Sequence, residues 1–316
     1  MSLVKGKVYP YTDPNHEPFL EEFFNRYPKG LLAVCAYGSR LSGQLASPTS
    51  FYDFYLICDN YSRFYKSKFH AIWNSFLPPN VYYLNLGKGS LDSPLKTCKY
   101  CVISLAHLKR EVGPNAKDFY HLGRFSKRQG IVWAAHPEVV DEMACIYLQA
   151  ARSILYWALR GLPSVFTLED MVKKCLMLSY EGEVRLEEAP KKVEAIFAAE
   201  REYYMKLFGS LISDPAHELK GDVHQINENT YEKRLPKSQL VRQKTALEKL
   251  KKRSKRRAQM RWPKQMLTVK NWQDIILSKL ERTWGIKLDL TEKQKKRWWI
   301  YGWKYFFKFK REGKFR

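Results

Sequence analysis

Two short apolar runs, at residues 30–36 and 52–58, constrain the fold more than any other feature of the sequence. Each has the length of a strand and is bounded by turn residues. The segment between them, "SRLSGQLASPTS", is rich in Ser and Gly and is typical of a loop. These features predict a mixed sheet with helices, and thus an α/β (α+β) fold. Its other elements are expected at 17–26 and 61–76, as helices, and at 80–86 and 99–108, as strands.

From residue 137 to 211 the apolar residues recur with helical periodicity, which predicts a small helical domain. One helix is expected to end at Gly161, and the next begins with a capping box from Thr167 to Asp170. A winged-helix arrangement is one candidate for this domain. We therefore divide the chain into residues 1–135, 136–219 and 220–316.

The positive charge of the chain is concentrated near its C-terminus. The whole sequence carries +23, and residues 220–316 alone hold 29 Lys and Arg against 9 Asp and Glu, a balance of +20. The first 219 residues are thus close to neutral, at +3. This distribution predicts that the C-terminal region meets an anionic partner.

The same region is rich in aromatic residues, with an amphipathic stretch over 268–284 and eight aromatics among residues 298–309. Trp and Tyr favour the headgroup zone of a bilayer, and Lys and Arg favour an anionic leaflet. We interpret the tail as a monotopic membrane anchor. A helical cap on the body and an RNA-binding surface are the alternatives. The predicted membrane residues are Trp272, Trp284, Trp298, Trp299 and Trp303.

Cysteine usage indicates a reducing, intracellular compartment. The six cysteines lie mostly inside apolar segments, as reduced core cysteines do. Cys98 and Cys101 have zinc-ribbon spacing, but no second pair completes such a site. The sequence shows neither an apolar leader nor an apolar stretch long enough to span a bilayer. We therefore expect a cytoplasmic protein, peripheral on the inner face of the membrane.

The end of the first apolar run carries the pattern that points to chemistry. Gly38 and Ser39 follow that run, and Asp53 opens the second one. The N–H groups of such a turn converge on one spot, and a glycine lets the chain approach a phosphate closely. An acid on the adjacent strand can hold Mg²⁺. The pattern favours a nucleoside triphosphate site of the nucleotidyltransferase fold.

This candidate site lacks the second acid of the usual Asp-x-Asp pair, because Tyr55 stands in its place. Asp59 shares a strand face with Asp53 but lies roughly 20 Å away, at about 3.3 Å per residue. The two cannot share a metal, so either one metal suffices or another acid folds in. From the residues alone, a loop between core strands with a strand-end aspartate fits equally well.

Three ordered blocks over residues 35–190 resemble the mitochondrial-type phosphatidate cytidylyltransferases, the translocator assembly and maintenance family. The tail is similar to that of bacterial members. The sequence departs from the family pattern where Cys101 replaces Gly and where Glu181-Gly182-Glu183 replaces Met-Gly-Asp. The blocks are "AYGSRLSGQ…FYDFYLICD", "KYCVISLAHLKREV…DFYHLGRFSKRQGIVW" and "LMLSYEGEVRL".

The resemblance implies an enzyme that makes CDP-diacylglycerol and pyrophosphate from phosphatidate and CTP, with Mg²⁺. It implies that Gly38 and Ser39 cradle phosphates and that Asp53 binds the metal. Arg124 and Lys127, on the matched Gly-Arg-x-x-Lys segment, are expected to meet the triphosphate or the phosphatidate headgroup. The expected catalytic residues are Asp53, Ser39 and Lys127.

An acid beside this site could supply the missing metal ligand, and Glu183 is the candidate. Two other functions stay open. An RNA nucleotidyltransferase would use the basic, aromatic tail to hold nucleic acid, although the missing second Asp speaks against it. A non-catalytic nucleotide module tethered to a membrane or to nucleic acid would bind without turnover. The expected partners are CTP, phosphatidate and an anionic membrane surface.

Overall fold

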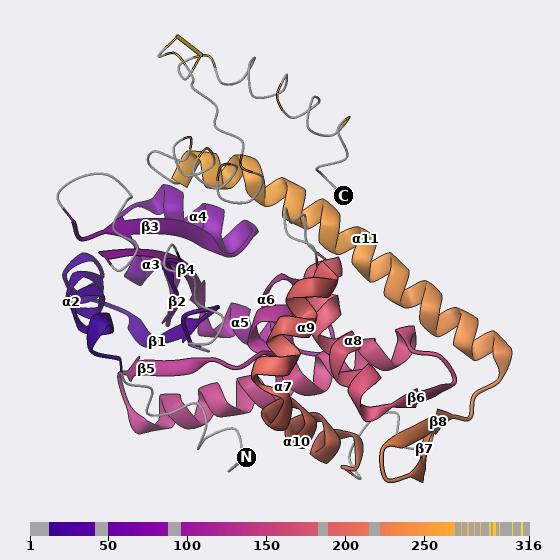
Figure 1. The fold of residues 1–316 in the computed structure, drawn as a ribbon. Coiled ribbons are helices and arrows are strands. Elements are labelled where there is room, and N and C mark those ends of the chain that lie inside the picture. The colour runs from indigo at the N-terminus through magenta and orange to yellow at the C-terminus, as the bar shows by residue number, and fades with distance from the viewer. Residues whose placement is uncertain are drawn as a thin grey trace.

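The computed structural model describes residues 13–41, 50–87, 96–182, 189–214 and 222–268, with a few single positions beyond (Figure 1). Its strands form two sheets. They are β1 (Leu31–Tyr37), β2 (Tyr52–Cys58), β3 (Asn80–Asn85), β4 (Thr97–Ser104), β5 (Gly130–Ala134), β6 (Val165–Thr167), β7 (Val223–Asn227) and β8 (Thr230–Lys233).

The larger sheet has five strands in the order β3-β4-β2-β1-β5, and the smaller has the order β6-β8-β7. In the larger sheet β2 and β4 run parallel, while the other neighbours are antiparallel. The predicted mixed sheet with helices is therefore confirmed. The two apolar runs became β1 and β2, side by side at the centre of this sheet.

Eleven helical segments surround the sheets within the described residues. Residues 61–76, predicted as one helix, form two because Tyr65 is extended between them. Within the stretch of helical periodicity, α9 and α10 are separated at Glu200, whose backbone is not helical. The segments are η1 (Pro14–His16), α2 (Glu17–Arg26), α3 (Tyr61–Phe64), α4 (Lys68–Phe76), α5 (Leu105–Val112), α6 (Phe119–Phe125), α7 (Pro137–Gly161), α8 (Leu168–Glu181), α9 (Ala189–Ala199), α10 (Arg201–Ile212) and α11 (Lys237–Thr268).

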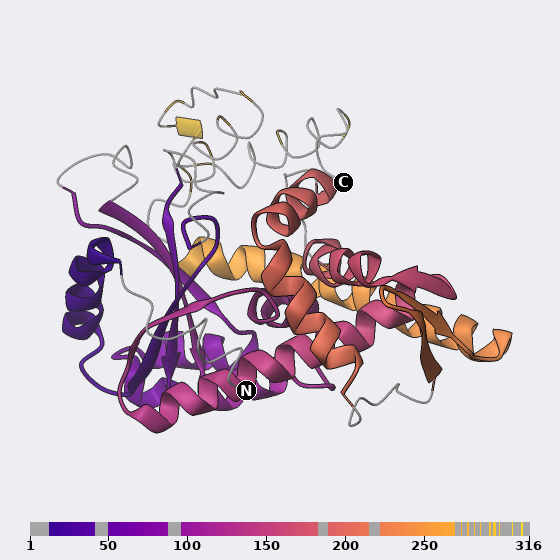
Figure 2. The same ribbon diagram turned by 60° about the horizontal axis from the view of Figure 1, so that its bottom comes forward.

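Both faces of the larger sheet are covered, which explains why its central strands are apolar throughout. One face, with Cys35 and Tyr55, joins a core that extends into α5–α10. The other face, with Val34 and Phe54, packs against Phe23 of α2. Helix α7 extends from the sheet to α8 and α10 (Figure 2). The division of the chain into three domains stays a prediction.

The C-terminal helix α11 is part of the folded body. It crosses from the smaller sheet to β3 and α4 as the long orange helix of Figure 1. Pro263 lies inside the helix, which continues to Thr268. In the described part of the chain, no helix is long and apolar enough to cross a membrane.

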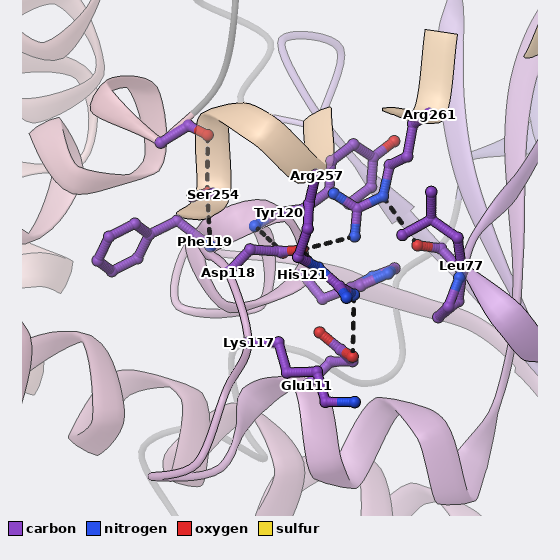
Figure 3. Close-up of polar contacts among 12 residues, drawn as sticks. Leu77, Glu111, Lys117, Asp118, Phe119, Tyr120, His121, Ser254, Arg257 and Arg261 are labelled. Carbon is purple, nitrogen blue, oxygen red and sulfur yellow. Dashed lines mark hydrogen bonds and ion pairs between the residues drawn. The ribbon is translucent and has the colours of Figure 1, made fainter. Parts of the chain in front are cut away.

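Asp118 fastens α11 to the body, as Figure 3 shows. Its fully buried carboxylate accepts hydrogen bonds from Arg257 and, at 2.8 Å, from Nη2 of Arg261. Ser254 of α11 accepts the N–H of Phe119 at 3.0 Å. Burial raises the pKa of Asp118, but the positive charges of Arg261 and Arg257 lower it by more. The pKa therefore falls to about 2. The carboxylate is therefore ionised in the folded protein.

We predict that Asp118→Asn lowers the free energy of unfolding at neutral pH by about 3–5 kcal/mol, because it leaves the buried guanidinium of Arg261 without its anion, while Arg257 keeps its pair with Glu111 at 3.4 Å. The folded pKa lies below the ordinary value of 3.8, so the carboxylate stabilises the fold above pH 4. That contribution is lost as the pH falls towards about 2. Urea unfolding at several pH values measures both effects.

The matched control is Asp214→Asn, since Asp214 pairs with Arg152 at the protein surface. A surface pair contributes up to about 1 kcal/mol. Equal losses in the two variants would contradict the structural role assigned to Asp118.

Candidate active site

The turn after β1 lies directly against Asp53. Tyr37, the last residue of β1, pairs with Asp53 in β2. Gly38 has a φ of 89°, in the left-handed region that favours glycine. A Cβ on Gly38 would lie 2.8 Å from Oδ2 of Asp53. Only a residue without a side chain lets the turn come this close to the carboxylate.

Contacts with Ser50, at the start of the next segment, hold the turn in place. The Oγ atoms of Ser39 and Ser50 are 3.4 Å apart. Nε of Arg40 donates to the carbonyl of Ser50 at 2.7 Å, and its guanidinium lies over the Tyr52 ring. These contacts bring the two ends of the connecting loop together and keep Ser39 beside Gly38.

Lys99 also belongs to this site, although it was not among the residues predicted from the sequence. It lies opposite Asp53 on the parallel neighbour β4, and its Nζ is 3.0 Å from Oδ1 of Asp53. Burial lowers the pKa of Lys99, but the charge of Asp53 outweighs it, so that pKa is raised. The lysine therefore stays cationic and neutralises the carboxylate.

Arg124 approaches the same face of the sheet through Tyr120. The guanidinium of Arg124 stacks on the Tyr120 ring, 3.7 Å from its centroid, and donates to the Tyr120 carbonyl at 2.7 Å. The Tyr120 hydroxyl lies 4.0 Å from Sγ of Cys101, and the Tyr37 hydroxyl lies 3.7 Å from the same sulfur. Burial raises the pKa of Tyr37, and the charge of Arg124 opposes this rise. The charges of Arg124 and Asp53 thus both act on the Tyr37 hydroxyl.

Lys127 points towards the end of α8. Its Nζ donates to Oγ of Ser179 at 3.2 Å and lies 4.9 Å from the ring centroid of Tyr180. Ser179 and Tyr180 belong to the third sequence block, and the Gly-Arg-x-x-Lys segment belongs to the second. The structure therefore brings the second and third blocks together.

A family model described as mitochondrial phosphatidate cytidylyltransferase matches residues 20–297 of this chain. The match covers all three sequence blocks, the Gly38 turn, Asp53, Lys99 and all of α11, and it continues beyond that helix. The chain belongs to this family. No curated protein matches it.

Membership in the phosphatidate cytidylyltransferase family confirms the predicted enzyme class, a nucleotidyltransferase that forms CDP-diacylglycerol. It also extends the resemblance beyond the three blocks, because the match continues past residue 190 into the C-terminal region. The residue roles predicted within the family stay predictions.

The carboxylate of Asp53 suits a Mg²⁺ ion that the bound nucleotide would help to hold. Mg²⁺ is usually held by one or two carboxylates together with substrate phosphates and waters. Oδ2 of Asp53 faces the Gly38 turn, where a phosphate would be cradled. The described residues contain no cluster of three or more His, Cys, Asp and Glu that could hold a metal. The residues therefore fit a metal that binds together with the nucleotide.

The sequence also singles out Asp59 and the Cys98–Cys101 pair. Asp59 pairs with Arg63 at 3.0 Å, at the opposite end of β2 from Asp53, as its spacing predicted. Cys98 and Cys101 are buried on opposite faces of the sheet, so they cannot ligate one metal together. The predicted residues that lie outside the described part of the chain are Glu183, Trp272, Trp284, Trp298, Trp299 and Trp303.

We predict that Gly38→Ala weakens binding of CTP at least about tenfold, because the new Cβ pushes the turn away from Asp53 and a loss of about 1.4 kcal/mol is tenfold. The positive φ also costs about 1–2 kcal/mol of stability. Isothermal titration of CTP in the presence of Mg²⁺ measures the first effect, and thermal unfolding measures the second.

Gly30→Ala is the matched control. Gly30, just before β1, also has a positive φ, and its Cβ would press on the carboxylate of Asp59. This variant should lose similar stability and keep its affinity for CTP. If both variants lose the same affinity, the Gly38 turn has no special part in nucleotide binding.

Proposed function

We propose that the protein transfers the cytidylyl group of CTP to phosphatidate at the site formed by Gly38, Ser39 and Asp53. The observation that carries this proposal is the contact between the glycine turn and the carboxylate. A phosphate oxygen of phosphatidate attacks the α-phosphorus of CTP and forms a new P–O bond. The bond from that phosphorus to the bridging oxygen breaks, and pyrophosphate leaves with its electron pair.

This chemistry requires positioning and charge neutralisation more than proton transfer. The attacking phosphate is already ionised near neutral pH, so no strong general base is required. The N–H groups of the Gly38–Ser39 turn bind phosphate oxygens and align the α-phosphorus with the attacking oxygen. Asp53 would hold Mg²⁺, which when bound supplies positive charge beside the phosphates.

The cationic side chains around the turn have two roles, to position Asp53 and to contact phosphate oxygens. Lys99 is a positioning residue, because its Nζ fixes the carboxylate of Asp53 from the neighbouring strand. Arg124 offers a guanidinium whose planar fork suits two phosphate oxygens, and Lys127 offers a point charge near α8. Together they offset the negative charge of two substrates that both carry phosphate.

We further propose that the reaction takes place at the cytoplasmic face of a membrane. Phosphatidate is a bilayer lipid, so an enzyme that acts on it must reach the bilayer surface. The aromatic, basic region after residue 268 supplies the chemistry for that contact, with Trp side chains for the headgroup zone and Lys and Arg for anionic lipids.

We predict that Asp53→Asn lowers the rate of pyrophosphate release by about 10²-fold or more, as expected when one preorganised electrostatic group is removed. The assay contains purified protein, Mg²⁺, CTP and phosphatidate in mixed micelles. Release should require phosphatidate and should prefer CTP to other nucleoside triphosphates.

Asp59→Asn is the control for this variant, since Asp59 lies at the far end of the same strand and pairs with Arg63. Its rate should stay close to that of the unaltered protein. Extension of an RNA end, with no reaction on phosphatidate, would replace the lipid substrate by nucleic acid. CTP binding without turnover on any acceptor would favour a non-catalytic module.

We predict that Lys99→Met lowers kcat by about 10-fold or more, because Asp53 loses the cation that orients it. Lys99→Arg should restore part of the rate, since a guanidinium can pair with the same carboxylate. Lys109→Met, which removes a surface pair with Glu142, is the control. A normal kcat in Lys99→Met would show that the Lys99–Asp53 pair is incidental.

A further inference from the structure

Helix α4 exposes a stripe of large apolar side chains. Phe69 is 49% exposed, Ile72 is 66% exposed and Phe76 is 70% exposed. Their spacing of three and four residues places them on one face of the helix, while Ala71 and Asn74 are buried against the body. Three adjacent exposed side chains of this size on one helix are the kind of patch that marks an interaction site.

The chain segment that carries this stripe has basic residues and no acidic ones. From Asn60 to Leu91 the sequence contains no Asp or Glu. Three exposed cations precede the stripe, at Arg63, Lys66 and Lys68; Arg63 pairs with Asp59, so Lys66 and Lys68 carry the excess positive charge. An apolar stripe beside exposed cations complements a surface that is apolar inside and anionic outside, which describes a bilayer with anionic headgroups.

The stripe also lies beside the point from which the aromatic tail begins. Nε of Arg261 donates to the Pro78 carbonyl at 2.9 Å, and Nζ of Lys264 donates to the Pro79 carbonyl at 3.0 Å. These carbonyls follow directly after the end of α4 at Phe76. The last turns of α11 are thus tied to the end of α4 (Figure 1), and in the sequence the basic, aromatic residues follow α11.

We propose that the exposed face of α4, with Phe69, Ile72 and Phe76, is a membrane-docking surface that inserts into the headgroup region of an anionic bilayer. The choice of a bilayer as the partner rests on the proposed function, because the lipid substrate resides there. The body of the enzyme then contacts the membrane directly, at a place next to the start of the tail. The docking surface is distinct from the tail residues predicted from the sequence.

The first test places an environment-sensitive probe on the stripe. Cys145 is exposed and the other five cysteines are buried, so Ile72→Cys in a Cys145→Ser background can be labelled selectively with nitrobenzoxadiazole. Vesicles of phosphatidylcholine with phosphatidylglycerol should shift the emission to the blue, and vesicles of phosphatidylcholine alone should do so much less. Emission that is already blue-shifted without vesicles, or that never shifts, overturns the proposal.

The second test compares two sets of substitutions in the full chain by vesicle flotation. Phe69→Ser, Ile72→Ser and Phe76→Ser together should weaken binding to the anionic vesicles at least about tenfold, given the apolar area removed. The control set is Val165→Ser, Ile226→Ser and Val241→Ser, three exposed apolar residues on β6, β7 and α11. Equal binding by both sets overturns the proposal, as does a dimer that only the α4 set dissociates.

A failure of the α4 docking surface can be distinguished from a failure of the proposed transferase activity. With a short-chain, water-soluble phosphatidate, the α4 variant should form CDP-diacylglycerol at the normal rate, while on vesicles it should be slow. Loss of activity on both substrates would mean that α4 serves the fold or the site, and would overturn the proposal. Phosphatidylglycerol is not the substrate, so vesicle binding still decides the docking surface if the unaltered protein shows no transferase activity.

Discussion

The antiparallel register of β1 and β2 is the constraint on which the site depends. Because Tyr37 pairs with Asp53, the Gly38 turn meets one carboxylate oxygen, and the parallel register with β4 brings Lys99 to the other. A slip by one residue would turn every side chain of β2 to the opposite face. Burial of Cys35 and Tyr55 on the same face opposes such a slip, since it would expose the core.

The positive charge of the C-terminal region has more than one use. Part of it holds the fold together, because Arg257 and Arg261 of α11 meet the buried carboxylate of Asp118. Arg261 also lies over the ring of Tyr120, 4.5 Å from its centroid, and the same ring carries Arg124. Helix α11, which precedes the tail in the sequence, thus contacts Tyr120, the ring on which Arg124 stacks. Arg124 is a candidate phosphate-binding residue. Helix α11 and the segment that carries Arg124 therefore meet at one aromatic ring.

The sequence was sufficient for the features that depend on local pattern. Apolar runs located β1 and β2, and the glycine turn with the following acid located the Gly38–Asp53 contact. It was insufficient where partners are distant in the chain. Lys99 became visible only with the register of β4, and Asp118 and Arg261 are 143 residues apart. Pattern also failed at residues 65–67 and at Glu200, where non-helical residues interrupt continuous helical periodicity.

The most direct test of the central claim is a crystal structure with Mg²⁺ and a CTP analogue whose α–β bridging oxygen is replaced by methylene. The account predicts triphosphate oxygens on the N–H groups of Gly38 and Ser39 and a metal ion on Asp53. Nucleotide bound elsewhere, with Asp53 still paired with Lys99, would contradict it.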